Sequence, residues 1–217
     1  MLKLQEELRK RLGDEYDTYM SNTIVIAREI ALFAHRNQKR LDGSSYIRHP
    51  AEMANFYRDI TGLNDDGYND YDEDLVLSLG IPCFGIQEIC WLHDVIEDTG
   101  YSEVEIRDVY ESAGLGRYYN MYIKDGLLLI THDKSEPYPL YIEKVNKNIN
   151  SALVKFLDLI NNSNPITLDH LGDKELDRIQ RYASYMKTIN DKYHFIEKLN
   201  ELCTIIKMLR LSKETDS

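Results

Sequence analysis

The chain has 217 residues, of which 43% are apolar and 29% are charged, as in an ordinary globular protein of one domain, or of one domain with an appendage. Its formal net charge of −11 argues against non-specific nucleic-acid binding, which needs an excess of Lys and Arg to neutralise phosphates. A small phosphorylated substrate stays compatible with this charge, because a few local cations and a metal ion reverse the sign inside a cleft.

The amino-terminal segment and the cysteines indicate a cytoplasmic protein with no membrane partner. Residues 1–16 are charged and amphipathic and lack the apolar core of a signal peptide. No run of the chain approaches the ~20 apolar residues of a membrane span. Cys83, Cys90 and Cys203 form no CxxC motif, so we expect reduced and mostly buried thiols.

The hydrophobic pattern of the first third of the chain predicts helices. Residues 16–38 carry one wide apolar stripe, at spacings of mostly three and four. His49-Pro50 opens a second helix that runs to about residue 60, with the proline in the first turn, where its missing N–H has no partner to lose. Residues 62–74 are acidic and short of aliphatic side chains, and we expect them to form an exposed loop.

The remaining two thirds also have a helical pattern. An apolar and therefore buried helix is predicted over residues 83–97, ended by Thr99-Gly100. Ser102 and Glu105 form a capping box that starts the next helix. Further helices are predicted over 117–130, 138–162, 173–189 and 191–211. Because no internal repeat and no convincing strand pair is found, the predicted class is all-α.

The segment WLHDVIEDTG, residues 91–100, concentrates polar groups in an apolar helix. Glu97 follows His93 by four positions, and Asp98 follows Asp94 in the same way, which places each pair on one side of a helix. Burying carboxylates and an imidazole is costly unless they are paired or bind a metal ion. The alternative is an exposed acidic helix end, in which Asp94 does no more than pair with a lysine.

Two distant segments favour a metal site over that alternative. His49 follows a turn and stands at the start of a helix, in SSYIRHP. Asp158 lies among aliphatic side chains in KFLDLINN, with Asn162 one turn further on, and a carboxylate in such surroundings needs a partner. A lone histidine such as His49 is more often structural, but the three segments together indicate one site.

These motifs resemble the HD superfamily of metal-dependent phosphohydrolases. The pattern HxxQxR…GxxYIxHP, then LHDxxEDT and a K-x-x-D-x-x-x-N helix, is most similar to the hydrolase domain of the RelA/SpoT alarmone enzymes and their small stand-alone relatives. The similarity runs from about Ala34 to Asn162, and HDVIEDT is specific to that branch. It implies one all-α HD domain over residues 1–217, with a core at about 16–165 and helices at about 173–211 packed on it. The periodicity of these last helices also fits a contact between two copies of the chain.

The resemblance implies a role for each matching residue. The metal ligands would be His49, His93, Asp94 and Asp158, and the ion usual in this branch is Mn²⁺, although another first-row divalent ion would suit the same ligands. The acidic pair Glu97 and Asp98 would activate or orient the attacking water. The substrate contacts would be Arg40, Tyr46, Asn162, Arg178 and Tyr182.

The activity implied is hydrolysis of a phosphate ester or pyrophosphate of a nucleotide, similar to (p)ppGpp 3′-pyrophosphohydrolases. The cation would lower the pKa of a water and polarise a phosphoryl oxygen. Leu41 and Leu159 stand where this branch usually has basic residues, and Ser45 where it has proline. Guanosine tetraphosphate is therefore not fixed as the substrate, and other 3′-phosphorylated or pyrophosphorylated nucleotides, including NADPH, stay open.

Two other functions stay open beside the hydrolase. The chain could be an HD-fold module that senses a nucleotide or binds a partner with little turnover, which the loss of a basic residue at Leu41 and the acidic insertion motivate. It could also be a nucleoside monophosphate phosphatase, although the EDT extension argues mildly against this. Outside the motifs, we expect His35 to be a structural histidine near the site and His132 to lie exposed in a loop.

Overall fold

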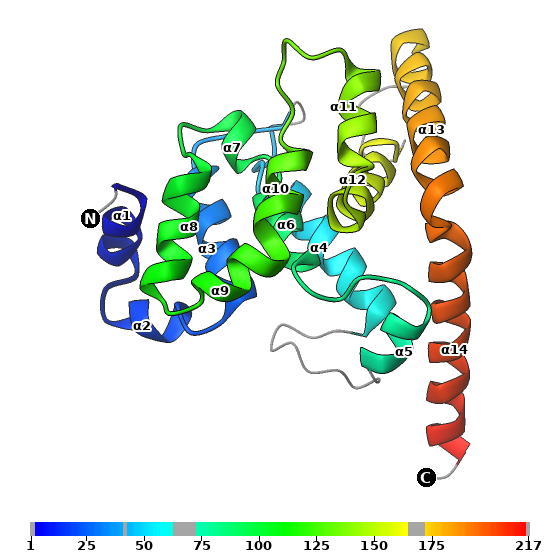
Figure 1. Ribbon diagram of the computed structural model, residues 1–217, viewed down its shortest axis with the longest axis horizontal. Coiled ribbons are helices and arrows are strands. Elements are labelled where there is room, and N and C mark those ends of the chain that lie inside the picture. The colour runs from blue at the N-terminus through cyan, green and yellow to red at the C-terminus, as the bar shows by residue number, and fades with distance from the viewer. Residues whose placement is uncertain (1–2, 41–42, 63–72, 165–171, 216–217) are drawn as a thin grey trace.

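The computed structural model describes residues 3–40, 43–62, 73–164 and 172–215. In these ranges the chain is helical, and an isolated antiparallel bridge between Lys39 and Ser45 is the nearest it comes to a strand. The predicted all-α class is therefore confirmed (Figure 1). None of the helices in these ranges combines the length and the apolar character needed to cross a membrane.

The first helices are α1 (Lys3–Leu12), a 3₁₀ turn at Gly13–Glu15, α2 (Tyr16–Tyr19) and α3 (Thr23–Ala34). The apolar stripe predicted from residue 16 is thus broken between α2 and α3. The Asn22 side chain explains the break, because it accepts hydrogen bonds from the backbone N–H groups of Ile24 and Val25 at 2.9 and 3.0 Å. An asparagine in this position caps a new helix and ends the continuity of the previous one.

The next helices are α4 (Arg48–Thr61), α5 (Glu73–Ser78) and α6 (Ile86–Leu92). The helix predicted to start at His49-Pro50 is confirmed, and it ends at Gly62 in the left-handed conformation. Most of the predicted 62–74 loop lies outside the described residues. In the centre of the fold, α6 packs against both α3 and α4.

The continuous helix predicted over 83–97 is wrong, because His93 and Asp94 interrupt it. α6 ends at Leu92, and α7 (Val95–Asp98) begins after Asp94. The start at residue 83 is also wrong. Gly85 precedes α6 with a φ of 81°, and a Cβ there would lie 2.2 Å from the carbonyl oxygen of Tyr122. A side chain could not be accommodated at this position.

The capping box predicted at Ser102 and Glu105 is confirmed and starts α8 (Glu103–Ser112). The helix predicted over 117–130 is present in three parts, α9 (Gly116–Tyr118), a π-helical turn at Tyr119–Ile123 and α10 (Lys124–Ile130).

The single helix predicted over 138–162 is wrong, since the chain forms α11 (Tyr138–Val145) and α12 (Ile149–Asn162). Asn148 caps the second of these helices, because its side chain accepts from the N–H groups of Asn150 and Ser151 at 2.8 and 3.2 Å. α12 is deeply buried and contacts α4, α6, α10 and α13.

The last two helices are α13 (Asp173–Tyr193) and α14 (Phe195–Thr215), joined at His194 with a φ of 56°. α13 packs on α12, and α14 packs on α4. Figure 1 shows them following one another along one edge of the molecule, opposite the amino terminus. The single HD domain over residues 1–217 stays a prediction, and so does a contact between two copies of the chain.

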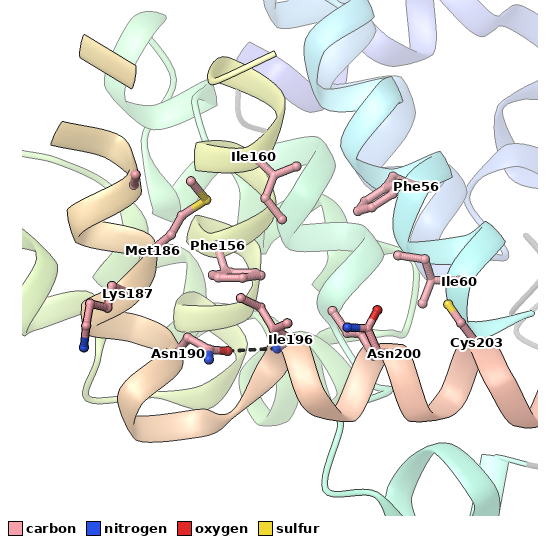
Figure 2. A pocket seen from close by; sticks show the side chains of 12 residues that line it. Phe56, Ile60, Phe156, Ile160, Met186, Lys187, Asn190, Ile196, Asn200 and Cys203 are labelled. Carbon is pink, nitrogen blue, oxygen red and sulfur yellow. Dashed lines mark hydrogen bonds between the residues drawn. The ribbon is translucent and has the colours of Figure 1, made fainter. Parts of the chain in front are cut away.

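A groove of 570 Å³ lies between α4, α12, α13 and α14. Figure 2 shows Phe56 and Ile60 of α4 on one side of it and Phe156 and Ile160 of α12 on another. On α12, these two positions lie on the face opposite Asp158, because they are two residues away from it on either side. The groove is therefore separate from the predicted metal site.

Candidate active site

The predicted ligands His49 and His93 are both buried, and each ring has one nitrogen fixed by a hydrogen bond. His49 Nδ1 lies 2.7 Å from the side-chain oxygen of Asn161, and His93 Nδ1 lies 2.8 Å from the carbonyl oxygen of Cys90. Because both partners are acceptors, Nδ1 carries the proton in each ring. Nε2 is then the nitrogen that can bind a metal ion.

The two Nε2 atoms point to the same place, where the predicted carboxylate ligands also lie. His49 Nε2 is 3.0 Å from Asp158 Oδ1 and 3.9 Å from Asp94 Oδ2. His93 Nε2 is 2.9 Å from Asp94 Oδ2 and 4.0 Å from Asp158 Oδ1. Single ligand atoms of His49, His93 and Asp94 all lie within 4.8 Å of one another. The structure thus brings together four side chains from α4, the α6–α7 junction and α12.

The chemistry of these four groups fits a divalent cation. His93 Nε2 is buried without a hydrogen-bond partner, although the Asp94 carboxylate is close. An imidazole lone pair and a carboxylate at this distance repel unless a proton or a cation lies between them. Without an ion the proton has this place, since Asp94 and Asp158 outweigh the effect of burial and raise the pKa of His93 to about 9. A set of two imidazoles and two carboxylates suits first-row divalent ions.

Asp158 is held by two other residues of α12. Lys155 Nζ donates to Oδ2 at 2.7 Å, and Asn162 Nδ2 donates to Oδ1 at 2.5 Å. Although burial opposes ionisation of the carboxyl, Lys155 and the two histidines keep the pKa of Asp158 far below its usual range. Asn162 was predicted to contact a substrate phosphate, but in this structure it contacts the predicted metal ligand.

Tyr46 also contacts a ligand. Its hydroxyl donates to Asp94 Oδ2, and its ring centroid lies 4.8 Å from that of His35. His35 is buried, and its Nδ1 contacts the side-chain oxygen of Gln38. The side-chain N–H of Gln38 donates to the carbonyl oxygen of Asp98 at 2.8 Å. The contacts of His35 are those of the structural histidine predicted from the sequence.

The acidic pair lies beside this cluster, with the two carboxylates in different surroundings. Glu97 is half-buried, and burial raises its pKa above the usual value, helped by the charges of Asp94 and Asp98. Its Oε2 accepts the backbone N–H of His132 at 3.2 Å. The prediction that His132 is solvent-exposed is wrong, because the residue is half-buried. Its ring packs against that of Tyr141, with 4.5 Å between the ring centroids.

The other predicted substrate contacts are more widely spread. Arg40 is half-buried. The pKa of Glu52 of α4 is lowered despite burial, by hydrogen bonds from Asn161 and Arg48 and by the charge of Arg48, with a smaller contribution from the charge of Arg40. Arg178 and Tyr182 lie on α13, where Arg178 Nε is buried without a hydrogen-bond partner. Leu41, which departs from the family pattern, lies outside the described residues.

Sequence reasoning gave no role to Lys155 and Asn161, which hold two of the predicted ligands. Lys155 had a signal, since it lies three residues before Asp158 and so shares its helix face. Asn161 had none, because it contacts His49 from 112 positions away. Glu52 fixes the orientation of the Asn161 amide by accepting from its Nδ2 at 3.1 Å.

The chain is similar to known proteins in sequence and in fold. No family model matches the chain. It is similar to a probable guanosine-3′,5′-bis(diphosphate) 3′-pyrophosphohydrolase of Synechocystis sp., with 28% identity over 149 residues, which are 68% of this chain. The chain spans 17% of the length of that relative.

The fold is shared with a solved structure, a metazoan ortholog of SpoT that hydrolyses ppGpp and plays a role in starvation responses. The TM-score is 0.55 at 19% identity, and the match covers 87% of this chain and 95% of the other. The resemblance to the hydrolase domain of RelA/SpoT enzymes, predicted from the three motifs, is therefore confirmed in sequence and in fold.

Proposed function

We propose that the chain is a metal-dependent phosphohydrolase that cleaves a phosphate ester or pyrophosphate of a nucleotide, in the manner of a (p)ppGpp 3′-pyrophosphohydrolase. One observation carries the proposal. His49 and His93, each with Nδ1 already hydrogen-bonded, direct Nε2 toward the same oxygens of Asp94 and Asp158. Buried imidazole nitrogens and carboxylate oxygens whose lone pairs face one another are stable when a cation lies between them.

The resident ion would be Mn²⁺, held by these four residues. Mixed imidazole and carboxylate ligands select this group of metals more than Ca²⁺ or Mg²⁺, which prefer oxygen alone. A bound divalent ion supplies Lewis acidity to a phosphoryl oxygen and lowers the pKa of a water. Tyr46 and Asn162 would orient Asp94 and Asp158, through the hydrogen bonds that they donate to these carboxylates.

The acidic pair would handle the proton and the water. Glu97 accepts the proton of the attacking water, a role that suits a half-buried carboxylate whose pKa lies above its usual value. Asp98, more exposed, orients the water. Arg40 and Arg178 supply positive charge to the transferring phosphoryl group, with Tyr182 as a further substrate contact.

The substrate would be a nucleotide with phosphate groups on the 3′ and 5′ positions of the ribose, because the relative from Synechocystis sp. is named for guanosine-3′,5′-bis(diphosphate). The protein would act in the cytoplasm, a compartment that suits three free cysteines.

The test is a hydrolysis screen with purified protein and Mn²⁺ over a panel of nucleotides, with products identified by mass spectrometry. The panel includes guanosine-3′,5′-bis(diphosphate), NADPH and nucleoside monophosphates. We expect pyrophosphate or phosphate release that stops with a chelator and with Asp94→Ala. Full activity of Asp94→Ala would overturn the assignment. Nucleotide binding without turnover in the wild type would instead identify a sensing module.

A further inference from the structure

The loop between α10 and α11 is held in one conformation by its own side chains. Asp133 Oδ1 accepts from the backbone N–H and the hydroxyl of Ser135, at 2.9 and 2.7 Å. His132 Nε2 lies 3.0 Å from the carbonyl oxygen of Glu136, and its ring packs against Tyr141. The residue between these contacts, Lys134, is therefore presented from a structured loop.

This loop lies against both members of the acidic pair. The backbone N–H of His132 donates to Glu97 Oε2 at 3.2 Å, and Lys134 Nζ lies 3.4 Å from Asp98 Oδ1. Lys134 thus places a positive charge directly beside the residue proposed to orient the attacking water. None of the motifs found in the sequence includes this lysine.

Lys155 and Lys134 differ in which charged groups their ammonium groups can contact. Lys155 has 11% of its side chain exposed and is bound to Asp158 at 2.7 Å, so its charge is already used. Lys134 has 72% of its side chain exposed, and its distance of 3.4 Å from Asp98 is long for an ion pair. An exposed pair of this kind adds little stability, and the ammonium can therefore exchange Asp98 for a more highly charged anion.

We propose that Lys134 binds a substrate phosphate at the rim of the site. The proposal rests on the proposed function and narrows its substrate to nucleotides that carry more than the phosphate being cleaved. The carboxylates of Asp94, Glu97 and Asp98 repel such an anion, and an exposed cation beside them offsets this repulsion. A lysine suits the task, because it contacts phosphate as a point charge without demanding one orientation.

The experiment compares Lys134→Met with Lys134→Arg and with a matched control, Lys187→Met. Lys187 has 73% of its side chain exposed, is also paired with an aspartate, and lines the groove on the far side of α12. For guanosine-3′,5′-bis(diphosphate) and Mn²⁺ we expect Lys134→Met to raise KM roughly tenfold, as for loss of one charge-assisted contact. We expect kcat to change less than KM, and the arginine variant and the control to stay near wild type.

Two further readouts separate substrate binding from a structural role. The affinity for Mn²⁺ in the absence of nucleotide should be unchanged in Lys134→Met. The KM of this variant should also rise less steeply with salt than that of the wild type, because one ionic contact is missing. A KM within twofold of the wild type, or an equal rise in Lys187→Met, would overturn the proposal.

Failure of the proposed function would give a different result. If the wild type does not hydrolyse the nucleotide, its binding is measured by calorimetry in the presence of Mn²⁺. A roughly tenfold weaker affinity of Lys134→Met then supports the phosphate contact without turnover. Equal affinity of the two proteins, or no binding by the wild type, overturns it.

Discussion

The two faces of α12 bury side chains in opposite ways. One face carries Lys155 and Asp158, a buried pair of charges that depends on specific partners. The other carries Phe156 and Ile160, which line the apolar groove in front of α13 and α14. A charge pair in the interior contributes little net stability, because removing two ions from water offsets their attraction. An apolar side chain stabilises in proportion to the area it buries. One helix therefore separates a face needed for chemistry from a face needed for folding.

Breaking the charge pair should have the largest effect. Asp158→Ala leaves Lys155 buried and unpaired, and we expect it to abolish hydrolysis and to lower the free energy of unfolding by about 3–5 kcal/mol. The double variant Asp158→Ala/Lys155→Met should regain most of this stability but no activity, because an apolar pair replaces the ions and the metal ligand stays absent. Denaturant unfolding in EDTA and the hydrolysis assay measure the two outcomes. Recovery of activity in the double variant would contradict the assignment of chemistry to the face of α12 that carries Asp158.

Shortening the apolar face should affect stability alone. Phe156 is 2% exposed, and Phe156→Ala should lower the free energy of unfolding by about 3 kcal/mol, since it enlarges the groove. Hydrolysis per folded molecule and the affinity for Mn²⁺ should stay within twofold of the wild type at a temperature below the melting transition. A large fall in Mn²⁺ affinity would show that packing on this face positions Asp158.

Asn161 offers a smaller and more selective change on the polar side. Asn161→Ala removes the acceptor of His49 Nδ1–H, so the ring loses its fixed tautomer and orientation. We expect the affinity for Mn²⁺ to fall by about 10–100-fold, as for other residues that hold a metal ligand. Isothermal titration measures this, and the neighbouring Asn164→Ala, at the exposed end of the segment, serves as the control. Equal affinities of the two variants would remove Asn161 from the site.

Local hydrogen bonding decided which parts of the fold the sequence could predict. The capping box at Ser102 and the start of α4 depend on contacts within four residues, and both were predicted correctly. Asn22 and Asn148 were missed because each lies inside an apolar period, where the side chain competes with the helix for backbone N–H groups. Hydrophobic periodicity does not show whether the helix continues through such an asparagine or a new helix begins there.

The candidate site shows the same limit at longer range. Its four ligands could be predicted because their residue types and order match the family pattern, and the structure brings these side chains close together. The choice between Asn161 and Asn162 as the partner of His49 depends on how α12 is rotated against α4, which only the packing of the whole bundle sets. Lys134 was missed for another reason, since an exposed lysine in a loop is ordinary in any sequence.

The buried carboxyl of Glu88 can be compared with that of Asp158, and here we expect the smallest effect. Glu88 of α6 is buried like Asp158, but no Lys or Arg among the described residues forms an ion pair with it, and burial raises its pKa above the usual value of 4.5. The folded protein therefore holds a proton here that the unfolded chain releases, so stability falls as the pH rises above about 4.5. Glu88→Gln stays neutral, and we expect it to add about 1 kcal/mol at pH 8, or roughly 2–4 °C in Tm. The gain should shrink toward zero near pH 5, when melting is measured across this range. A gain in stability that does not depend on pH would mean that Glu88 is ionised in the folded protein. A buried carboxylate at this position would then need no cation such as Lys155, which pairs with Asp158.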